Sequence, residues 1–202
     1  MGSSSKPLSS ALFAGLTECL GTMGFSYRAT RQAWVRRSRF GVFSAHANIA
    51  RHPGEVGILV SANVRLDDVE TLVKPGSKDT ATIGTWLENL AGEQPLHYTV
   101  AAMSDVAPVV DKIMMLMRAF GEPFLMRHET PCAALELLLG DSRLAMQCAP
   151  LDDYRTMTVC ALLKLEGRWG EAQDYLKRRI PGLRKSDRQR VVEFASGLAA
   201  GV

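Results

Sequence analysis

Apolar residues recur every three or four positions over residues 8–23, and this spacing predicts an amphipathic helix near the start of the chain. A serine at position 9 or 10 is placed to cap it, because a serine oxygen accepts hydrogen bonds from free amide groups of the first turn. Gly24 should end the helix, since glycine adopts the left-handed conformation at little cost. The stripe consists of Leu8, Leu12, Leu16, Cys19, Leu20 and Met23.

Beyond Gly24 the pattern changes to alternation of apolar and polar residues, which predicts β-strands. Pro53 and Gly54 supply the dihedral angles of a hairpin turn, and a second turn is expected near residues 30–32. The connections are too short for the crossovers of a parallel sheet, so we expect an antiparallel meander. The predicted strands are 25–29, 34–37, 42–50 and 56–66, with a fifth strand or extended connector at 96–100.

Helical spacing returns after residue 102. Ser104 should cap a helix whose apolar stripe ends at Phe120, and Gly121 and Pro123 should break that helix. Thr130 and Pro131 predict the next start, with threonine as cap and proline in the first turn. Later helices are expected at 153–166, 170–179 and 187–198, the last behind a capping pair of Ser186 and Gln189.

The order of these elements predicts an α+β fold: an N-terminal helix, an antiparallel β-meander of about four to five strands, and a helical C-terminal half. We expect residues 1–102 to form the helix and the sheet, and residues 103–202 to form the helical half packed on that sheet. The length of 202 residues suits one compact domain with an ample core.

Composition predicts a cytoplasmic protein. The chain has no apolar run of about 18 residues that would span a bilayer, and its start, MGSSSKPLSS, has no apolar segment of secretory-signal length. The four cysteines form no CxxC pair and lie among apolar residues, which favours buried free thiols in a reducing compartment. These cysteines are Cys19, Cys132, Cys148 and Cys160.

Charge is spread unevenly along the chain. The formal net charge is +3, but residues 1–65 hold eight Lys or Arg against two acids, for a net +6, and the remainder carries −3. The first third should therefore attract anionic partners, although a field of this kind does not identify them.

The segment WVRRSRFGVF, residues 34–43, concentrates this charge beside aromatic rings. In an extended strand Arg37 and Arg39 share a face with Val35, whereas Trp34 and Arg36 lie on the other face. Three interpretations follow: charges that protect a sheet edge, a protein-binding surface, or phosphate contacts. We take the candidate partner-binding residues to be Trp34, Arg36, Arg37 and Arg39, and Tyr27, Phe40 and Phe43 as the aromatics that nucleic-acid stacking would need.

No motif of catalysis, metal binding or cofactor binding is present. The histidines His46, His52, His97 and His128 have no ligand spacing, and there is no nucleophile elbow and no phosphate-binding glycine loop. The acid pairs 67–68 and 152–153 stand at the starts of predicted helices, a short one through Leu72 and the one at 153–166, where acids cap free amide groups and complement the helix dipole. We therefore expect no metal, no cofactor and no enzymatic activity.

Several segments together resemble a known group. They are Leu20-Gly21-Thr22-Met23-Gly24-Phe25, Trp34-Val35-Arg36, Gly84-Thr85-Trp86-Leu87 and Gly121-Glu122-Pro123-Phe124-Leu125, followed by a terminal helical hairpin. Their order is similar to a family of small bacterial domains of unknown function, some encoded beside polymorphic toxins and regarded as immunity-like. The resemblance implies a protein that binds and neutralises a toxin, and it assigns no functional residue.

The expected function is therefore non-enzymatic: a cytoplasmic bacterial protein that binds another protein, as an immunity protein that sterically covers a toxin. Two alternatives stay open. One is a binder of single-stranded nucleic acid on the basic sheet. The other is an enzyme of undescribed type with a pocket between the sheet and the helices.

Overall fold

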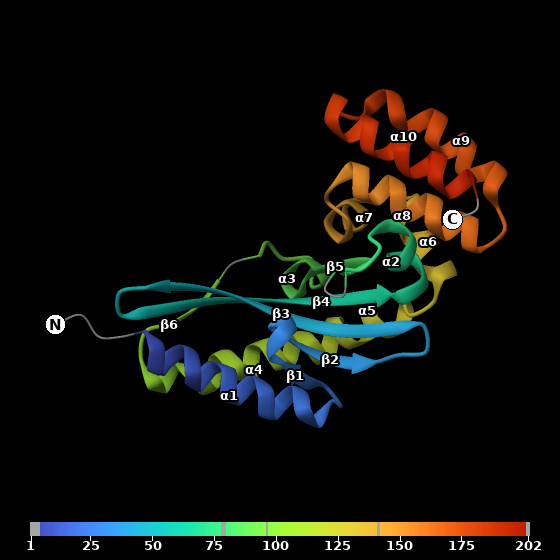
Figure 1. Ribbon diagram of the computed structural model, residues 1–202. Helices are drawn as coiled ribbons and strands as arrows, with labels where there is room; N and C mark the ends of the chain where they lie inside the picture. Colours follow the sequence, from blue (N-terminus) through green and yellow to red (C-terminus); the bar gives the residue numbers. More distant parts are fainter. Residues whose placement is uncertain (1–4, 78–79, 96, 141, 201–202) are drawn as a thin grey trace. The chain divides into compact units, whose positions relative to one another are not determined.

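The computed structural model describes residues 5–77, 80–95, 97–140 and 142–200. A long helix is followed by an antiparallel sheet and then by helices up to the last described turn (Figure 1). The predicted α+β fold is confirmed.

Five strands lie in the order β1-β2-β3-β4-β5, and β6 pairs with β4, antiparallel, through Val56 opposite Val100. From β2 to β5, each strand is thus hydrogen-bonded to the one before it in the chain, although residues 67–82 between β4 and β5 include a helix. Gly54 in the β3–β4 turn has φ of 84°, a left-handed value that glycine adopts without strain. The strands are β1 (Ser26–Arg28), β2 (Ala33–Arg37), β3 (Gly41–His52), β4 (Glu55–Leu66), β5 (Ile83–Trp86) and β6 (Tyr98–Val100).

The chain divides into two compact units, each assembled from segments that are separate in sequence. The first consists of Met1–Ser38, Val42–Asn63 and Thr85–Arg127, and the second of Arg39–Gly41, Val64–Gly84 and His128–Val202. The division into units does not coincide with the change from strands to helices near residue 102. Helices occur in both units, and β4 contributes residues to both.

In the first unit, helix α1 (Lys6–Thr22) lies beside α4 (Val106–Leu116), as Figure 1 shows. The predicted stripe of α1 is buried at Leu8, Leu12, Leu16 and Leu20, and Gly24 follows with φ of 82°. The predicted cap at Ser9 or Ser10 is wrong, because the helix begins at Lys6. Pro7 occupies its first turn, and the Ser9 hydroxyl donates a hydrogen bond back to the Lys6 carbonyl.

The predicted break at Gly121 and Pro123 is also wrong. The helical path continues from α4 through a π-helical turn, η3 (Met117–Gly121), into α5 (Glu122–Arg127). Proline lacks an amide donor and its ring clashes with the carbonyl four residues earlier in a regular α-helix. The wider π turn directly before Pro123 accommodates it without ending the helix. This unit also contains two short helical elements, α3 (Leu87–Leu90) and η2 (Met103–Asp105).

In the second unit, α8 lies against α2, α6, α9 and α10. Thr130 caps α6 as predicted, its hydroxyl accepting from the amide of Ala133 at 3.2 Å. Ser142 caps α7, a helix that the sequence analysis did not predict, and Ser186 lies inside α10 instead of capping it. The helices are α2 (Asp67–Val73), α6 (Pro131–Leu139), α7 (Arg143–Cys148), α8 (Asp152–Leu165), α9 (Trp169–Arg179), η4 (Ile180–Gly182) and α10 (Lys185–Ala199).

A buried carboxylate ties α2 to α8. Glu70 is fully buried and accepts hydrogen bonds from Thr82 at 2.9 Å, from Thr80 and from the Tyr154 hydroxyl at 2.6 Å. Burial beside Glu70 raises the pKa of Tyr154, so its hydroxyl remains a donor. The carboxylate is fully engaged by these donors, which is the arrangement of a structural polar network.

Candidate functional site

Trp34, the first candidate for partner binding, belongs to the core. Its side chain is fully buried, and its indole N–H donates to the Thr17 hydroxyl at 2.9 Å. The rings of Phe13 and Tyr27 lie 4.8 Å and 5.5 Å from it, between centroids. The expectation that Trp34 is an exposed anchor is wrong, because the face of β2 that carries it packs against α1.

Arg36 lies on the same face of β2 and has partners inside its unit. Its guanidinium donates to Glu122 at 2.7 Å and to the Met23 carbonyl at 2.8 Å. It also lies over the rings of Phe25 and Phe43, 4.7 Å and 5.3 Å from their centroids. Arg36 is therefore mainly a structural cation.

Arg37 and Arg39 are exposed, unlike the other two candidates. Arg37 ends β2 in the first unit. Arg39 lies in the second unit, where its backbone N–H donates to Glu129 at 3.0 Å and its guanidinium lies over the ring of Phe40. Their part in partner binding stays a prediction.

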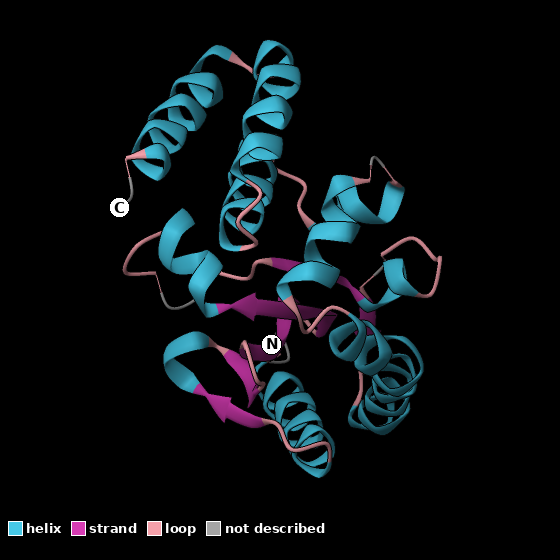
Figure 2. Ribbon diagram, turned by 90° about the vertical axis from the view of Figure 1, so that its right-hand side faces the viewer, coloured by secondary structure: helices cyan, strands magenta, loops and turns pink. Residues whose placement is uncertain are grey.

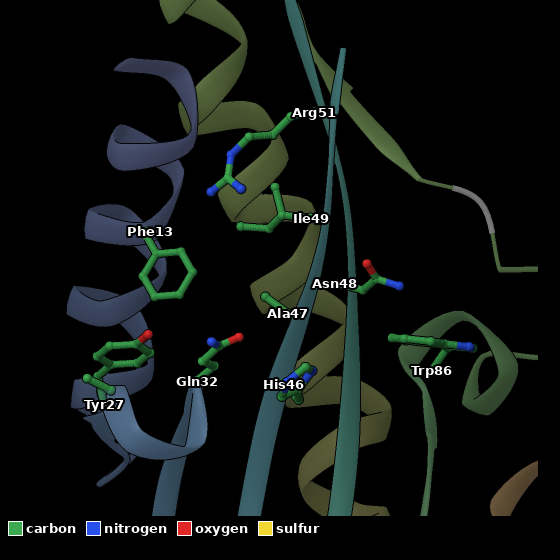
Figure 3. Close-up of a pocket in the computed structure, with 10 residues that line it drawn as sticks. Phe13, Tyr27, Gln32, His46, Ala47, Asn48, Ile49, Arg51 and Trp86 are labelled. Atoms are coloured by element: carbon green, nitrogen blue, oxygen red, sulfur yellow. The ribbon is translucent and has the colours of Figure 1, made fainter. Parts of the chain in front are cut away.

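A groove along β3 is a candidate binding site in the first unit. It has a volume of about 570 Å³ and combines aromatic rings with amides, a histidine and an arginine, the mixture typical of binding sites. Figure 3 shows Ala47, Ile49 and Arg51 pointing toward the Phe13 side of β3, and Asn48 toward Trp86. The lining residues are Phe13, Tyr27, Ala29, Gln32, His46, Ala47, Asn48, Ile49, Arg51 and Trp86.

The groove exists because β2 is shorter than β3. The pairing of β2 with β3 runs from Arg37 opposite Val42 to Ala33 opposite His46, whereas β3 continues to His52. Before Ala33 the chain turns away through η1 (Ala29–Arg31), which joins β1 to β2 (Figure 2). Gln32 makes this turn with φ of 49°, an uncommon left-handed value for a residue with a side chain.

The aromatic wall of the groove is held in place from inside. The Phe13 and Tyr27 rings meet edge to face, 5.0 Å between centroids and at 86°. Both also pack on the buried Trp34. Of the aromatics expected to stack on bases, Phe43 is buried and Tyr27 is engaged with Phe13, so these two do not form an open stacking surface.

A second hollow in the same unit is strongly basic. It has a volume of about 370 Å³ and is lined by Arg28, Arg31, Arg36 and Arg37 together with the hydroxyls of Ser26 and Thr30. Arg28 and Arg37 are exposed, whereas Arg36 is neutralised by Glu122. Guanidinium groups and hydroxyls are the donors that recognise phosphate, so this hollow suits an anion.

Three of the four paired acids of the sequence form ion pairs in the second unit. Asp67 accepts from Arg65 at 2.9 Å, Asp152 accepts from Arg155 at 2.8 Å, and Asp153 pairs with Arg190. They lie in the first turns of α2 and α8, where they complement the helix dipole. The predicted side-chain caps are not formed, because the N-cap residues are Leu66 and Leu151.

Glu88, in the first unit, is a buried acid in the first turn of α3. Its side chain is hydrogen-bonded to Tyr98, and its Oε2 atom is buried without a hydrogen-bond partner. Burial raises the pKa of Glu88. A perturbed acid of this kind is found at many active sites, but Glu88 does not line the groove on β3 or the arginine-lined hollow.

The cysteines are free, but only two of them are buried. Cys148 and Cys160 are buried, and burial raises the pKa of each thiol to about 12. Cys19 is partly exposed and Cys132 is exposed, so the prediction of four buried thiols is wrong for these two. Within the described residues, no three His, Cys, Asp or Glu side chains gather where a metal ion would bind, and no helix could cross a membrane.

No protein-family model matches the chain, and comparison with curated proteins and with solved structures finds no match.

The two neighbouring arginines of β2 should behave differently when replaced. Arg36→Ser removes two hydrogen bonds and leaves Glu122 without its cation, so we expect the free energy of unfolding to fall by about 1–2 kcal/mol. Arg37→Ser should lower it by less than Arg36→Ser does, because interactions of an exposed side chain contribute only about 0–1 kcal/mol. Urea denaturation of both variants measures the difference, and equal losses would contradict the internal role of Arg36.

Replacing Glu88 should stabilise the protein at neutral pH. Because the pKa of Glu88 is raised in the folded chain above its usual 4.5, its ionisation opposes folding, and the opposition grows as pH rises above 4.5. Glu88→Gln should therefore raise the melting temperature by a few degrees at pH 7 and by much less at pH 4. Glu18→Gln, at an exposed carboxylate, is the control and should have little effect at either pH. If Glu88→Gln raised the melting temperature no more at pH 7 than at pH 4, the raised pKa of Glu88 would be contradicted.

Proposed function

We propose that this chain is a non-enzymatic protein that binds another protein through the groove along β3. The observation that supports this most directly is the open stretch of β3 beyond β2, flanked by aromatic side chains and by Arg51. Tyrosine, tryptophan and arginine are the residues that most often supply binding energy at protein interfaces. The groove contains one of each, at Tyr27, Trp86 and Arg51.

The finer proposal is a bacterial immunity protein that neutralises a toxin by covering it. The groove carries Arg51 and His46 and no acidic side chain, so it suits an acidic face of the partner. Inhibition would be steric and would need no reaction at the interface. We place the protein in the cytoplasm, where the exposed thiol of Cys132 would stay reduced.

The non-enzymatic proposal is supported by what lines the groove. Its polar groups are amides, one histidine, one arginine, the Tyr27 hydroxyl and the Trp86 indole N–H, and neither a carboxylate nor a cysteine thiol is among them. The perturbed acid Glu88 lies outside that lining. General acid–base catalysis needs titratable groups within hydrogen-bond reach of one bound substrate.

A second candidate function is supported by the arginine-lined hollow. Arg28, Arg31 and Arg37 with Ser26 and Thr30 would bind the phosphates of a single-stranded nucleic acid. This candidate predicts retention of a labelled oligonucleotide that falls steeply with salt and is lost in Arg28→Ser. Binding of a protein partner in the groove predicts neither the salt-dependent retention of an oligonucleotide nor its loss in Arg28→Ser.

The groove proposal is tested by capturing partners from the source cell with the full chain and expressing each captured protein alone. Arg51→Glu reverses the exposed charge of the groove and should lower the affinity for a true partner about 10- to 100-fold. Arg178→Glu makes the same change at an exposed arginine of the second unit and should leave affinity unchanged. For a toxin, adding the chain in equal amount should abolish the toxin's activity.

Two outcomes would contradict the proposal. In the first, no captured protein binds the purified chain with submicromolar affinity. In the second, Arg51→Glu and Arg178→Glu weaken the partner equally, which would place the interface outside the groove.

A further inference from the structure

The stretch 47–52 of β3 is a sheet edge without a neighbour on one side. It pairs with β4, but β2 reaches only as far as His46. Among the described residues, no backbone hydrogen bond outside the regular elements involves residues 47–52. Six residues of strand extend about 20 Å, long enough for another strand to pair along them.

The backbone groups that this edge presents follow from the turn into β4. A two-residue turn at Pro53 and Gly54 makes His52 and Glu55 a hydrogen-bonded pair, so alternate residues back along β3 face β4. The carbonyls of Ser44 and His46 fit this alternation, since they accept from Asn63 and Ser61 of β4. The N–H and C=O groups of Ala47, Ile49 and Arg51 therefore face away from β4, toward the groove.

Natural proteins usually protect such an edge with proline, lysine or a bulge. The sequence from 47 to 52, Ala-Asn-Ile-Ala-Arg-His, contains neither proline nor lysine, and its charge lies at the end of the strand. Ile49 is half exposed beside Phe13, so an apolar side chain is left open next to the unpaired backbone.

We infer that the groove takes an extended peptide of the partner, which adds to the sheet as a strand antiparallel or parallel to β3. This inference rests on the proposed protein-binding function and specifies how the site works. Main-chain hydrogen bonds to Ala47, Ile49 and Arg51 supply affinity, and pockets for alternate side chains supply specificity.

The chemistry of the peptide follows from the side chains beside the edge. Residues facing Ile49 and Phe13 are apolar, because those two side chains form the half-buried wall of the groove. A carboxylate near one end faces Arg51, which is exposed and has no hydrogen bond or ion pair within the described part of the chain. The peptide therefore has apolar residues at alternate positions and an Asp or Glu near one end.

The test uses peptides selected on the full chain from a phage-displayed library of random 12-residue sequences. Ile49→Pro removes one edge N–H, and proline is tolerated where the N–H faces away from the neighbouring strand. We expect selected peptides to lose about tenfold or more in affinity for Ile49→Pro and to bind Ile49→Val nearly as well as the original. Circular dichroism and thermal melting establish that both variants are folded.

A second measurement does not depend on a protein variant. A selected peptide is N-methylated at successive single amides, and affinity should fall at alternate positions only, because only alternate amides of an added strand face β3. Enrichment of sequences with Asp or Glu, and weaker binding to Arg51→Glu, should accompany this pattern.

Several outcomes would overturn the inference. They are failure to select any peptide, equal binding to Ile49→Pro and Ile49→Val, and a loss of affinity without alternation on N-methylation. A concentration-dependent dimer that Ile49→Pro abolishes would show instead that a second copy occupies the edge. If a captured partner depends on Arg51 but not on the N–H of residue 49, the protein-binding function stands and strand addition is wrong.

Discussion

The buried indole of Trp34 is the interaction on which the arrangement of the first unit depends. It joins β2 to α1 through a hydrogen bond to Thr17, and it supports the Phe13 and Tyr27 rings. Complete burial of a tryptophan contributes several kcal/mol to stability, because truncating such a residue to alanine costs about 3–5 kcal/mol. The short β1–β2 hairpin is thereby fixed on the helix, and its turn at Gln32 ends the pairing of β2 at Ala33. The rest of β3 is left open.

The arginines of β2 are separated by the same packing. Because side chains alternate along a strand, Trp34 and Arg36 enter the interior while Arg37 stays in solvent. A dense run of positive charge in the sequence is thus not one surface. Arg36 and Arg37 both line the basic hollow, but Arg36 is already paired with Glu122 inside the unit, whereas Arg37 is exposed. Charge in a strand can be assigned a function only after the buried face is known.

Local patterns predicted the elements of the fold well. The stripe of α1, the turns at Gly24 and Gly54 and the cap at Thr130 each depend on a few neighbouring residues, and the structure has all of them. The π turn before Pro123 was not predicted, because whether a helix can contain a proline depends on the geometry of the turn that precedes it. The helix behind Ser142 was missed although its serine cap was a usable signal.

The candidate site could not be predicted in this way. The groove depends on where β2 stops opposite β3, and this register is a long-range property that no short segment records. Its walls come from positions as distant as Phe13, Ile49 and Trp86. The one local signal was the mismatch between the predicted strands 34–37 and 42–50, since a longer strand paired with a shorter one must leave an edge.

Amide hydrogen exchange of the free protein, followed residue by residue by NMR, tests the open edge most directly. The account predicts alternation: the amides of Ala47, Ile49 and Arg51 exchange rapidly, while those of Asn48, Ala50 and His52 are protected by β4. Equal protection of the two sets would show that this side of β3 is covered in the folded chain, and the central claim would be wrong.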